Sequence, residues 1–366
     1  MFCWPSGRHP DPGQGTRKSV SIRFLSVIVS CAFATATLHA AESPGNIFSI
    51  TGPGIERLPA SVLDVNSPAL RVTGTPGSMR IFDRSCHSPV PEADIRRRII
   101  DTAVQEWAWF GFLVDDLRNT GPDDSRTSFN RRRFMSFDPD EVTRVAPTVA
   151  GYWAAAPGSD WILQRQNDSW NGSSGLSSRW RDPWSAAFIS WVMCESGLGE
   201  VSSFQRAIAH HTYIDQAIRA RDGGNTEAAY EAFNPGETQI LPGDLLCSGL
   251  RPVYRNLDQR RAQLGVGART HCDIVVEVNE TDGSIFTIGG NVRSSVRLKI
   301  FPAAAEQDGT LAPLQTSRII FAHLKLRAAP VEKNALSNSL VMTNGICSRP
   351  PVPMLAIIAV DNSNNC

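Results

Sequence analysis

Apolar residues in the first half of the chain recur at the three- and four-residue intervals of amphipathic helices. The clearest stretch covers residues 92–110, where Ile95, Ile99, Ala103 and Trp107 follow one another in steps of four. The same kind of spacing predicts further helices over residues 142–161, 182–197 and 202–219.

From residue 240 onward the pattern changes to short extended runs separated by turn residues. Leu-Pro-Gly-Asp at 241–244 predicts a turn into a strand, and residues 248–270 form a polar stretch predicted as a loop. Strands are predicted at residues 271–278, 285–288, 292–300 and 319–326, with a hairpin turn at 281–284. Helices followed by antiparallel strands indicate the α+β class.

The N-terminus has the pattern of a signal peptide. Three basic residues, Arg17, Lys18 and Arg23, precede an apolar run over residues 24–36, and small residues follow near Ala40. The run is shorter than the roughly 20 apolar residues of a membrane-spanning helix. We therefore expect residues 1–40 to be removed on export, which places the mature protein in the periplasm or outside the cell.

A second interpretation of the same segment stays open, because Ile-Val-Ser-Cys ending at Cys31 resembles a bacterial lipoprotein box. A lipid on Cys31 would make the membrane a partner of the protein. Beyond the signal, residues 41–80 are rich in Pro, Gly and Ser and are predicted to be a linker with one short strand. Residues 81–327 are predicted to form the folded domain, with residues 328–366 as a tail that is either an ordered arm pinned by cysteine or disordered.

The amino-acid composition limits the classes of protein and partner that fit this chain. The 366 residues are 42% hydrophobic and 20% charged, as in an ordinary globular protein. Lys+Arg and Asp+Glu both number 36, so no overall positive charge favours nucleic acid as a partner. No cofactor is expected.

Export also determines how the cysteines are interpreted. Removal of residues 1–40 would leave six of them, an even number in an oxidising compartment, so disulfides are expected. No two have the C-x-x-C spacing of a thiolate zinc site, so no metal is expected. The sequence does not determine the pairing, although Cys247 and Cys272 end and begin two predicted strands and could be bridged across a sheet. The six are Cys86, Cys194, Cys247, Cys272, Cys347 and Cys366.

The helix predicted at residues 182–197 has a chemically distinctive start. Asp182 is a suitable N-cap and Pro183 a suitable first residue, which puts Ser185 third, beside free backbone N–H groups. Such a position lowers the pKa of a cysteine and stabilises an oxyanion, whereas a serine needs a neighbouring base. Cys194 lies nine residues later, about 180° around the helix, and is expected in the core or in a disulfide.

Four motifs together resemble a known family. P-W-S-A-A-F-I-S-W at residues 183–191, P-G-D at 242–244, His271 and G-G-N at 289–291 resemble the motifs of bacterial CHAP and NlpC-like amidases. Those enzymes have a papain-like fold and a cysteine nucleophile. H-x-x-Y-I at 210–214 and H-C-D-I-V-V at 271–276 resemble more closely an exported bacterial domain-of-unknown-function family, number 2272, that carries serine.

The resemblance implies a papain-like fold, with N-terminal helices packed on a small antiparallel sheet or half-barrel. By position, Ser185 takes the place of the nucleophile, His271 that of the general base, and Asn291 that of the residue that orients the imidazole. The implied activity is hydrolysis of an amide or ester bond in peptidoglycan peptides. The alternative is an inactive relative that binds peptidoglycan or a peptide in the same cleft.

Further side chains are candidates for substrate contact. Asp273 shares a strand face with His271 and is a rival partner for it. Trp184 is a candidate for the cleft wall as well as for the core. His211 lies on the apolar face of the helix predicted at 202–219, either as a packing residue or as part of a pocket, whereas His210 is expected to point about 100° away.

Overall fold

The computed structural model describes residues 47–345, apart from residues 53, 119–135, 225, 315 and 317. The predicted signal peptide, Cys31, Cys347, Cys366 and the end of the tail lie outside the described residues. Within them, no helix has both the length and the apolar character needed to cross a bilayer.

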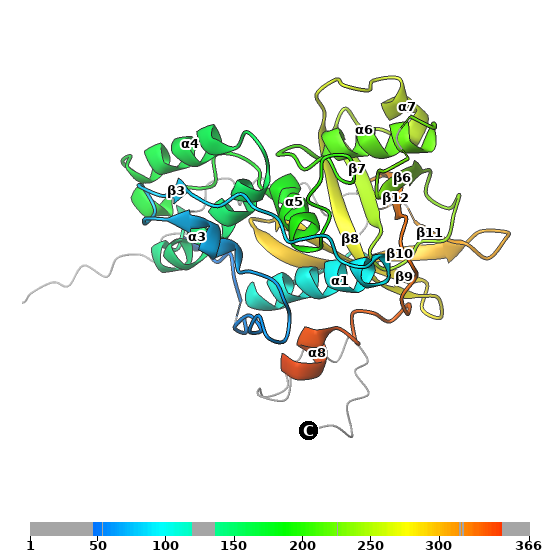
Figure 1. The fold of residues 1–366 in the computed structure, drawn as a ribbon, viewed down its shortest axis with the longest axis horizontal. Helices are drawn as coiled ribbons and strands as arrows, with labels where there is room; N and C mark the ends of the chain where they lie inside the picture. Colours follow the sequence, from blue (N-terminus) through cyan, green and yellow to red (C-terminus); the bar gives the residue numbers. More distant parts are fainter. Residues whose placement is uncertain are drawn as a thin grey trace, which may run out of the picture. The chain divides into compact units, whose positions relative to one another are not determined.

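An open sheet of eight strands forms one layer of the domain (Figure 1). The strand order is β11-β10-β9-β8-β7-β12-β6, with β4 added beside β10. All neighbours are antiparallel except β4 and β10. The strands are β4 (Val114–Asp116), β6 (Tyr230–Phe233), β7 (Leu245–Arg251), β8 (Arg269–Asn279), β9 (Ser284–Val292), β10 (Ser295–Ala305), β11 (Leu311–Pro313) and β12 (Ile320–Leu326).

Helices and short elements precede and flank this sheet, so the α+β class is confirmed. The helices are α1 (Glu92–Trp109), α3 (Pro139–Ala155), α4 (Asp160–Trp170), α5 (Ser185–Glu195), α6 (His210–Arg221), α7 (Leu257–Arg261), α8 (Leu340–Gly345) and the 3₁₀ helices η1 (Pro68–Arg71) and η2 (Gly175–Ser177). Two small sheets join β1 (Ile47–Phe48) to β5 (Ser136–Phe137) and β2 (Val72–Thr73) to β3 (Arg80–Ile81).

Two helix predictions need correction. The predicted helix at 142–161 is two helices, α3 and α4, separated at Gly158, which adopts a positive φ of 71°. The predicted helix at 202–219 begins only at His210. The residues before it are held in an irregular path, because the Ser190 hydroxyl donates to Ala207 O and accepts from Ala207 N, both at 2.9 Å.

Helix α5 lies at the centre of the core, and every one of its residues is buried. Trp184, just before it, stacks on Phe110 and Tyr152, with ring centroids 6.0 and 5.6 Å apart. On the sheet side, a Cβ on Gly290 would lie 2.5 Å from Phe188 Cβ. A glycine at residue 290 is therefore what lets β9 approach α5 this closely.

The two faces of the sheet bury different clusters. Cys272, Ile274 and Val276 of β8 belong to the main core, together with the side chains of α1 and α5. Val275 belongs to a separate cluster with Leu246, Ile285 and Phe301. Because side chains alternate along a strand, His271 and Asp273 share the face of Val275 rather than that of the main core.

Residues 41–80 are not a linker in the part that the structure describes. Ile50, Leu63, Val65 and Met79 are buried in the main core. Arg71, also buried, forms an ion pair with Glu195 of α5 at 2.5 Å. The segment is irregular because it is rich in Pro, Gly and Ser, and its lack of periodicity conceals how much of it is packed.

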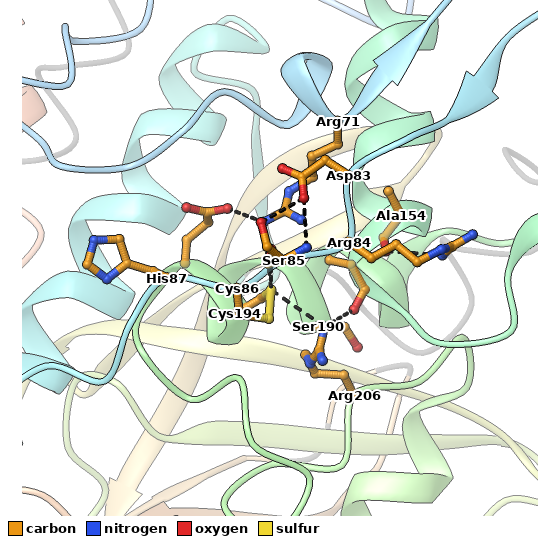
Figure 2. The surroundings of a disulfide bond; sticks show 12 residues. Arg71, Asp83, Arg84, Ser85, Cys86, His87, Ala154, Ser190, Cys194 and Arg206 are labelled. Carbon is orange, nitrogen blue, oxygen red and sulfur yellow. Dashed lines mark hydrogen bonds and ion pairs between the residues drawn. A yellow bond between two sulfur atoms is a disulfide. The ribbon is translucent and has the colours of Figure 1, made fainter.

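Two disulfides are present among the described residues. Cys247 and Cys272 are direct cross-strand partners and form a disulfide, which is the one pairing that the sequence suggested without determining it. The second joins Cys86 to Cys194, which confirms the disulfide alternative for Cys194 (Figure 2). It ties the segment that leads into α1 to the end of α5.

Removal of the Cys86–Cys194 bridge should destabilise the protein more than removal of Cys247–Cys272. The first bridge spans 108 residues and the second 25. From chain entropy alone, the free energy of unfolding should fall by about 5 kcal/mol without the first bridge and by about 3.5 kcal/mol without the second. Urea unfolding of the two double cysteine-to-alanine proteins measures both. The chain-entropy account is wrong if the Cys247–Cys272 bridge, which encloses fewer residues, proves the more stabilising.

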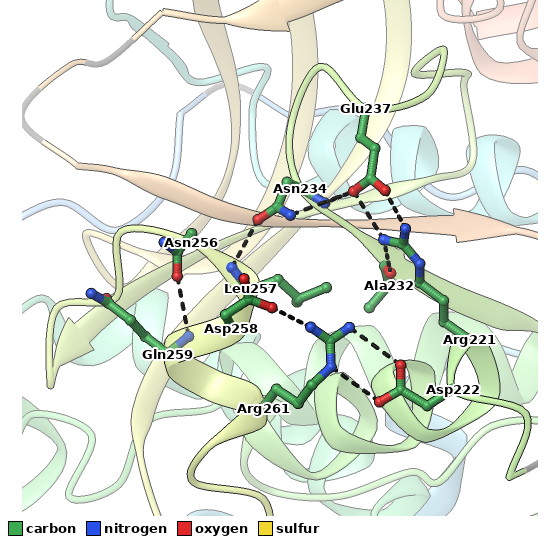
Figure 3. Close-up of polar contacts among 10 residues, drawn as sticks. All are labelled: Arg221, Asp222, Ala232, Asn234, Glu237, Asn256, Leu257, Asp258, Gln259 and Arg261. Carbon is green, nitrogen blue, oxygen red and sulfur yellow. Dashed lines mark hydrogen bonds and ion pairs between the residues drawn. The ribbon is translucent and has the colours of Figure 1, made fainter.

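The predicted loop at 248–270 contains helix α7, held against the end of α6 by polar contacts (Figure 3). Asn256 caps α7 by accepting from Gln259 N at 3.1 Å. Arg261 binds Asp222, and Leu257 N donates to Asn234 Oδ1 at 2.9 Å. The helix is only five residues long, which is too short to show a clear apolar period in the sequence.

The P-G-D motif has a structural explanation in a buried charge network. Asp244 accepts from Arg96 Nη1 at 2.6 Å, and it bonds His323 Nε2 at 2.8 Å. It also accepts from the backbone N–H groups of Leu241 and Leu326, each at 3.0 Å. Asp244 thus fastens α1 to the strands β7 and β12.

The described part of the predicted tail is an ordered arm. Ala335, Leu336, Val341 and Met342 are buried. Asp101 of α1 accepts from Leu340 N at 2.9 Å, at the start of α8. Burial raises the pKa of Asp101 to about 6.

Candidate active site

Ser185 is the first residue of α5 rather than the third. Trp184 occupies the N-cap position, and the first helical bond runs from Phe188 N to Trp184 O at 2.9 Å. Asp182 is not the cap, because its carboxylate faces Arg165 at 3.5 Å. Ser185 nevertheless stands at the positive end of the helix, beside first-turn N–H groups that lack intrahelical partners. It is 8% exposed.

The histidine bonded to Ser185 is His210. Its Nε2 lies 2.7 Å from Ser185 Oγ. The prediction that His210 points away from the apolar face assumed a helix that begins at residue 202. As the first residue of α6, His210 is instead buried, and it contacts Tyr213 one turn later. The spacing H-x-x-Y, which places both side chains on one helix face, was the sequence signal for this pair.

The contacts of His210 determine its proton positions. Cys272 N, which is only a donor, donates to His210 Nδ1 at 3.2 Å, and the Tyr213 hydroxyl also contacts Nδ1. Burial and the nearby charge of His271 lower the pKa of His210 well below its usual range, so the ring is neutral. A neutral ring that accepts at Nδ1 carries its proton on Nε2. At rest, His210 therefore donates to Ser185.

His271 belongs to a second, adjoining group of side chains. Its Nε2 lies 2.8 Å from Asp273 Oδ1 and 3.1 Å from Lys299 Nζ. Lys299 Nζ donates to both oxygens of Asp273, at 2.8 and 2.7 Å. Burial opposes the Asp273 charge, but the charges of His271 and Lys299 outweigh it and hold the pKa of Asp273 below its usual range.

The two groups meet through their histidines. The ring centroids of His210 and His271 are 5.2 Å apart. Among the described residues, no hydrogen bond joins His271 to Ser185. The structure thus brings together Ser185, His271 and Asp273 of the predicted residues, and adds His210, Tyr213 and Lys299. His271 does not occupy the position next to the serine that the resemblance implied.

The G-G-N motif shapes the site through its backbone. A Cβ on Gly289 would lie 1.8 Å from Asp273 Oδ1 and 3.2 Å from His271 Nε2. Asn291 has a positive φ of 55° and precedes the turn at Arg293 and Ser294, which also have positive φ. Within the described chain, no hydrogen bond links the Asn291 side chain to His271. Asn291 serves the turn, as its ability to adopt a left-handed backbone allows.

A Gly289→Ala substitution should therefore disrupt the Asp273 group. The added methyl cannot coexist with the Asp273 carboxylate, and displacement of a packed group of this kind costs about 1–3 kcal/mol. Gly267→Ala is the matched control, since its Cβ would meet nothing within 4 Å. Urea unfolding compares the two variants, and equal stability would show that the carboxylate moves aside freely.

The other two predicted contact residues lie elsewhere. Trp184 is fully buried in the core, so it does not line a cleft. His211 Nδ1 lies 3.1 Å from Ala268 O and is not bonded to the Ser185 group. The preceding residue, His210, is the histidine that contacts Ser185 instead.

Residues 142–323 match a bacterial family whose members are described as an uncharacterized protein conserved in bacteria, DUF2272. The matched segment contains Ser185, His210, His271, Asp273 and Lys299. No curated protein and no solved structure matches the chain. The matched segment starts within α3, so α1 and the residues before it lie outside the match.

Proposed function

We propose that this protein is an exported cell-envelope hydrolase that uses Ser185 to cleave an amide or ester bond in peptidoglycan peptides, on a papain-like scaffold. The observation that carries the proposal is the 2.7 Å contact between Ser185 Oγ and His210 Nε2 at the start of a buried helix. A hydroxyl next to an imidazole is the pair that serine nucleophiles require. His210 replaces His271 as the proposed base.

The proposed reaction begins with attack of Ser185 Oγ on the substrate carbonyl, while the Ser185 proton passes to His210 Nε2. His210 must first adopt the tautomer with its proton on Nδ1, and the Tyr213 oxygen is then the acceptor for that proton. The oxyanion is stabilised by N–H groups of the first turn of α5. His210 returns the proton to the leaving amine or alcohol, and water then hydrolyses the acyl-serine.

Two further features support the proposed export of the protein and the proposed role of His210. The disulfides Cys86–Cys194 and Cys247–Cys272 are compatible with an exported protein. The lowered pKa of His210, caused first by burial, keeps its ring neutral at neutral pH, which a general base requires.

Labelling with a fluorophosphonate probe tests the nucleophile. The wild-type protein is expected to be labelled, and Ser185→Ala and His210→Gln should reduce the rate at least about 10³-fold. Ser196→Ala is the control, since Ser196 is buried at the opposite end of α5 and its hydroxyl has no partner among the described residues. Labelling that persists in Ser185→Ala would rule out Ser185. Product analysis of digested peptidoglycan then identifies the bond.

One observation favours a second candidate, a binding domain without catalysis. The Cys272 N–H bond to His210 Nδ1 keeps the proton on Nε2, where it blocks proton transfer from Ser185. In that case wild-type protein is not labelled, and Ser185 and His210 hold a ligand by hydrogen bonds. Amidase activity that appears only in Ser185→Cys would favour this candidate over the hydrolase.

A further inference from the structure

Three arginines lie at or near the ends of the interior strands β7, β8 and β12, next to the His271 group. In the register of the sheet, Ser248 of β7 pairs with His271 of β8 on one side and with Ile320 of β12 on the other. Outward from there, Gly249 pairs with Thr270, and beyond a register shift Arg251 pairs with Arg269. Strands β12, β7 and β8 are neighbours, so these positions lie near one another at one end of the three strands.

Two of the arginines, Arg251 and Arg269, share a sheet face with His271 and Asp273. Arg269, His271 and Asp273 alternate along β8, so all three side chains project from the same side, with Arg269 about 7 Å along the strand from His271. Arg251, paired with Arg269, projects from that side too.

Arg318 adds a third positive charge near the same place. It precedes Ile320 by two residues. Burial is the largest cause that lowers the pKa of both His271 and Lys299, and the positive charge of Arg318 lowers both further. The Arg318 guanidinium therefore lies within electrostatic reach of both side chains.

These charges are exposed and uncompensated. Arg251, Arg269 and Arg318 are all exposed, and within the described chain no ion pair or hydrogen bond joins their guanidinium groups to a protein partner. Like charges directly opposite each other on neighbouring strands are destabilising. Of the charged side chains in the His271 group, only Asp273 is acidic, and Lys299 already neutralises it.

We infer that Arg251, Arg269 and Arg318 form a binding site for a carboxylate group of the substrate, next to the His271 group. The inference rests on the proposed function for the identity of that substrate. A guanidinium binds a carboxylate through two parallel hydrogen bonds, which gives both affinity and orientation. Peptides with a free carboxylate are therefore the substrate class, and neutral or amidated peptides are disfavoured.

Calorimetric titration with two forms of one peptidoglycan stem tetrapeptide tests this inference. One form has free carboxylates and the other has them amidated, and the protein is the mature chain with Ser185→Ala, which prevents turnover. The free-acid peptide should bind about tenfold more tightly, as expected of charge-assisted bonds. Arg251→Gln, Arg269→Gln and Arg318→Gln together should abolish that ratio, and 0.5 M NaCl should reduce it.

Arg80→Gln is the matched control, because Arg80 is an exposed arginine on β3, outside this sheet, and it should keep the tenfold ratio. Equal binding of the two peptides, binding of neither, or a ratio that survives the triple substitution overturns the inference. Fluorophosphonate labelling of Ser185 reports on the proposed hydrolase separately. Labelled protein without carboxylate preference refutes only the arginine site, and preference without labelling refutes only the hydrolase.

Discussion

Asp244→Ala should lower the free energy of unfolding by about 3–5 kcal/mol, the typical cost of leaving a buried charge without its partner. The substitution removes the only carboxylate bonded to the buried guanidinium of Arg96 in the described structure. It also leaves the N–H groups of Leu241 and Leu326 without their acceptor. Urea unfolding monitored by tryptophan fluorescence measures the loss.

Asp168→Ala serves as the control, because Asp168 is exposed on α4 and bonds only Gln164 in the described residues. The double substitution Arg96→Met with Asp244→Leu should cost less than the sum of the two single ones, since it removes both charges together. A loss below about 1 kcal/mol for Asp244→Ala would place the network among weakly contributing ion pairs.

Acid should destabilise the protein through its buried histidines. Burial lowers the pKa of His210 and of His271 in the folded state. Below about pH 6.5 an unfolded histidine binds a proton that the folded one does not, so stability falls with pH. Each histidine contributes a slope of up to about 1.4 kcal/mol per pH unit.

Other groups act at different pH or with the opposite sign. The raised pKa of Asp101, about 6, means that the folded state takes up a proton first, which adds stability as pH falls from 6 towards 4. The lowered pKa of Asp273 matters only below about pH 4, where the unfolded carboxylate binds a proton first.

Unfolding of wild-type protein and of His210→Gln between pH 5 and 7.5 isolates the histidine contribution. The variant should have the shallower dependence, by up to about 1.4 kcal/mol per pH unit below pH 6. Asp101→Asn is the control of opposite sign and should steepen the loss of stability in acid. Parallel curves for wild type and His210→Gln would show that His210 titrates alike in the folded and unfolded states.

Local pattern was enough to predict much of the fold. The periodicity of residues 92–110 predicted α1, and alternating runs after residue 240 predicted β8, β9, β10 and β12. The positions of Cys247 and Cys272 at the ends of two predicted strands suggested their disulfide without determining it. In each case the signal lies within one element or between sequence neighbours.

The site was harder to predict because its central contact is not local. Ser185 and His210 are 25 residues apart, and their contact depends on where α6 begins. That start is decided by the bonds between Ser190 and Ala207, which no periodicity reveals. The sequence indicated that Ser185 and His271 lie near each other, but it did not reveal that His210 is the histidine within hydrogen-bond distance of Ser185.

The disulfide between Cys86 and Cys194 has a practical consequence for any shortened version of the protein. The matched DUF2272 residues begin at 142, so a polypeptide cut at that limit would lack Cys86, Arg71 and all of α1. Helix α5 would lose its covalent tether and the ion-pair partner of Glu195, and its core neighbours from α1 would be missing. The packing around Ser185 therefore depends on residues that precede the matched segment, and an expressed fragment should include them.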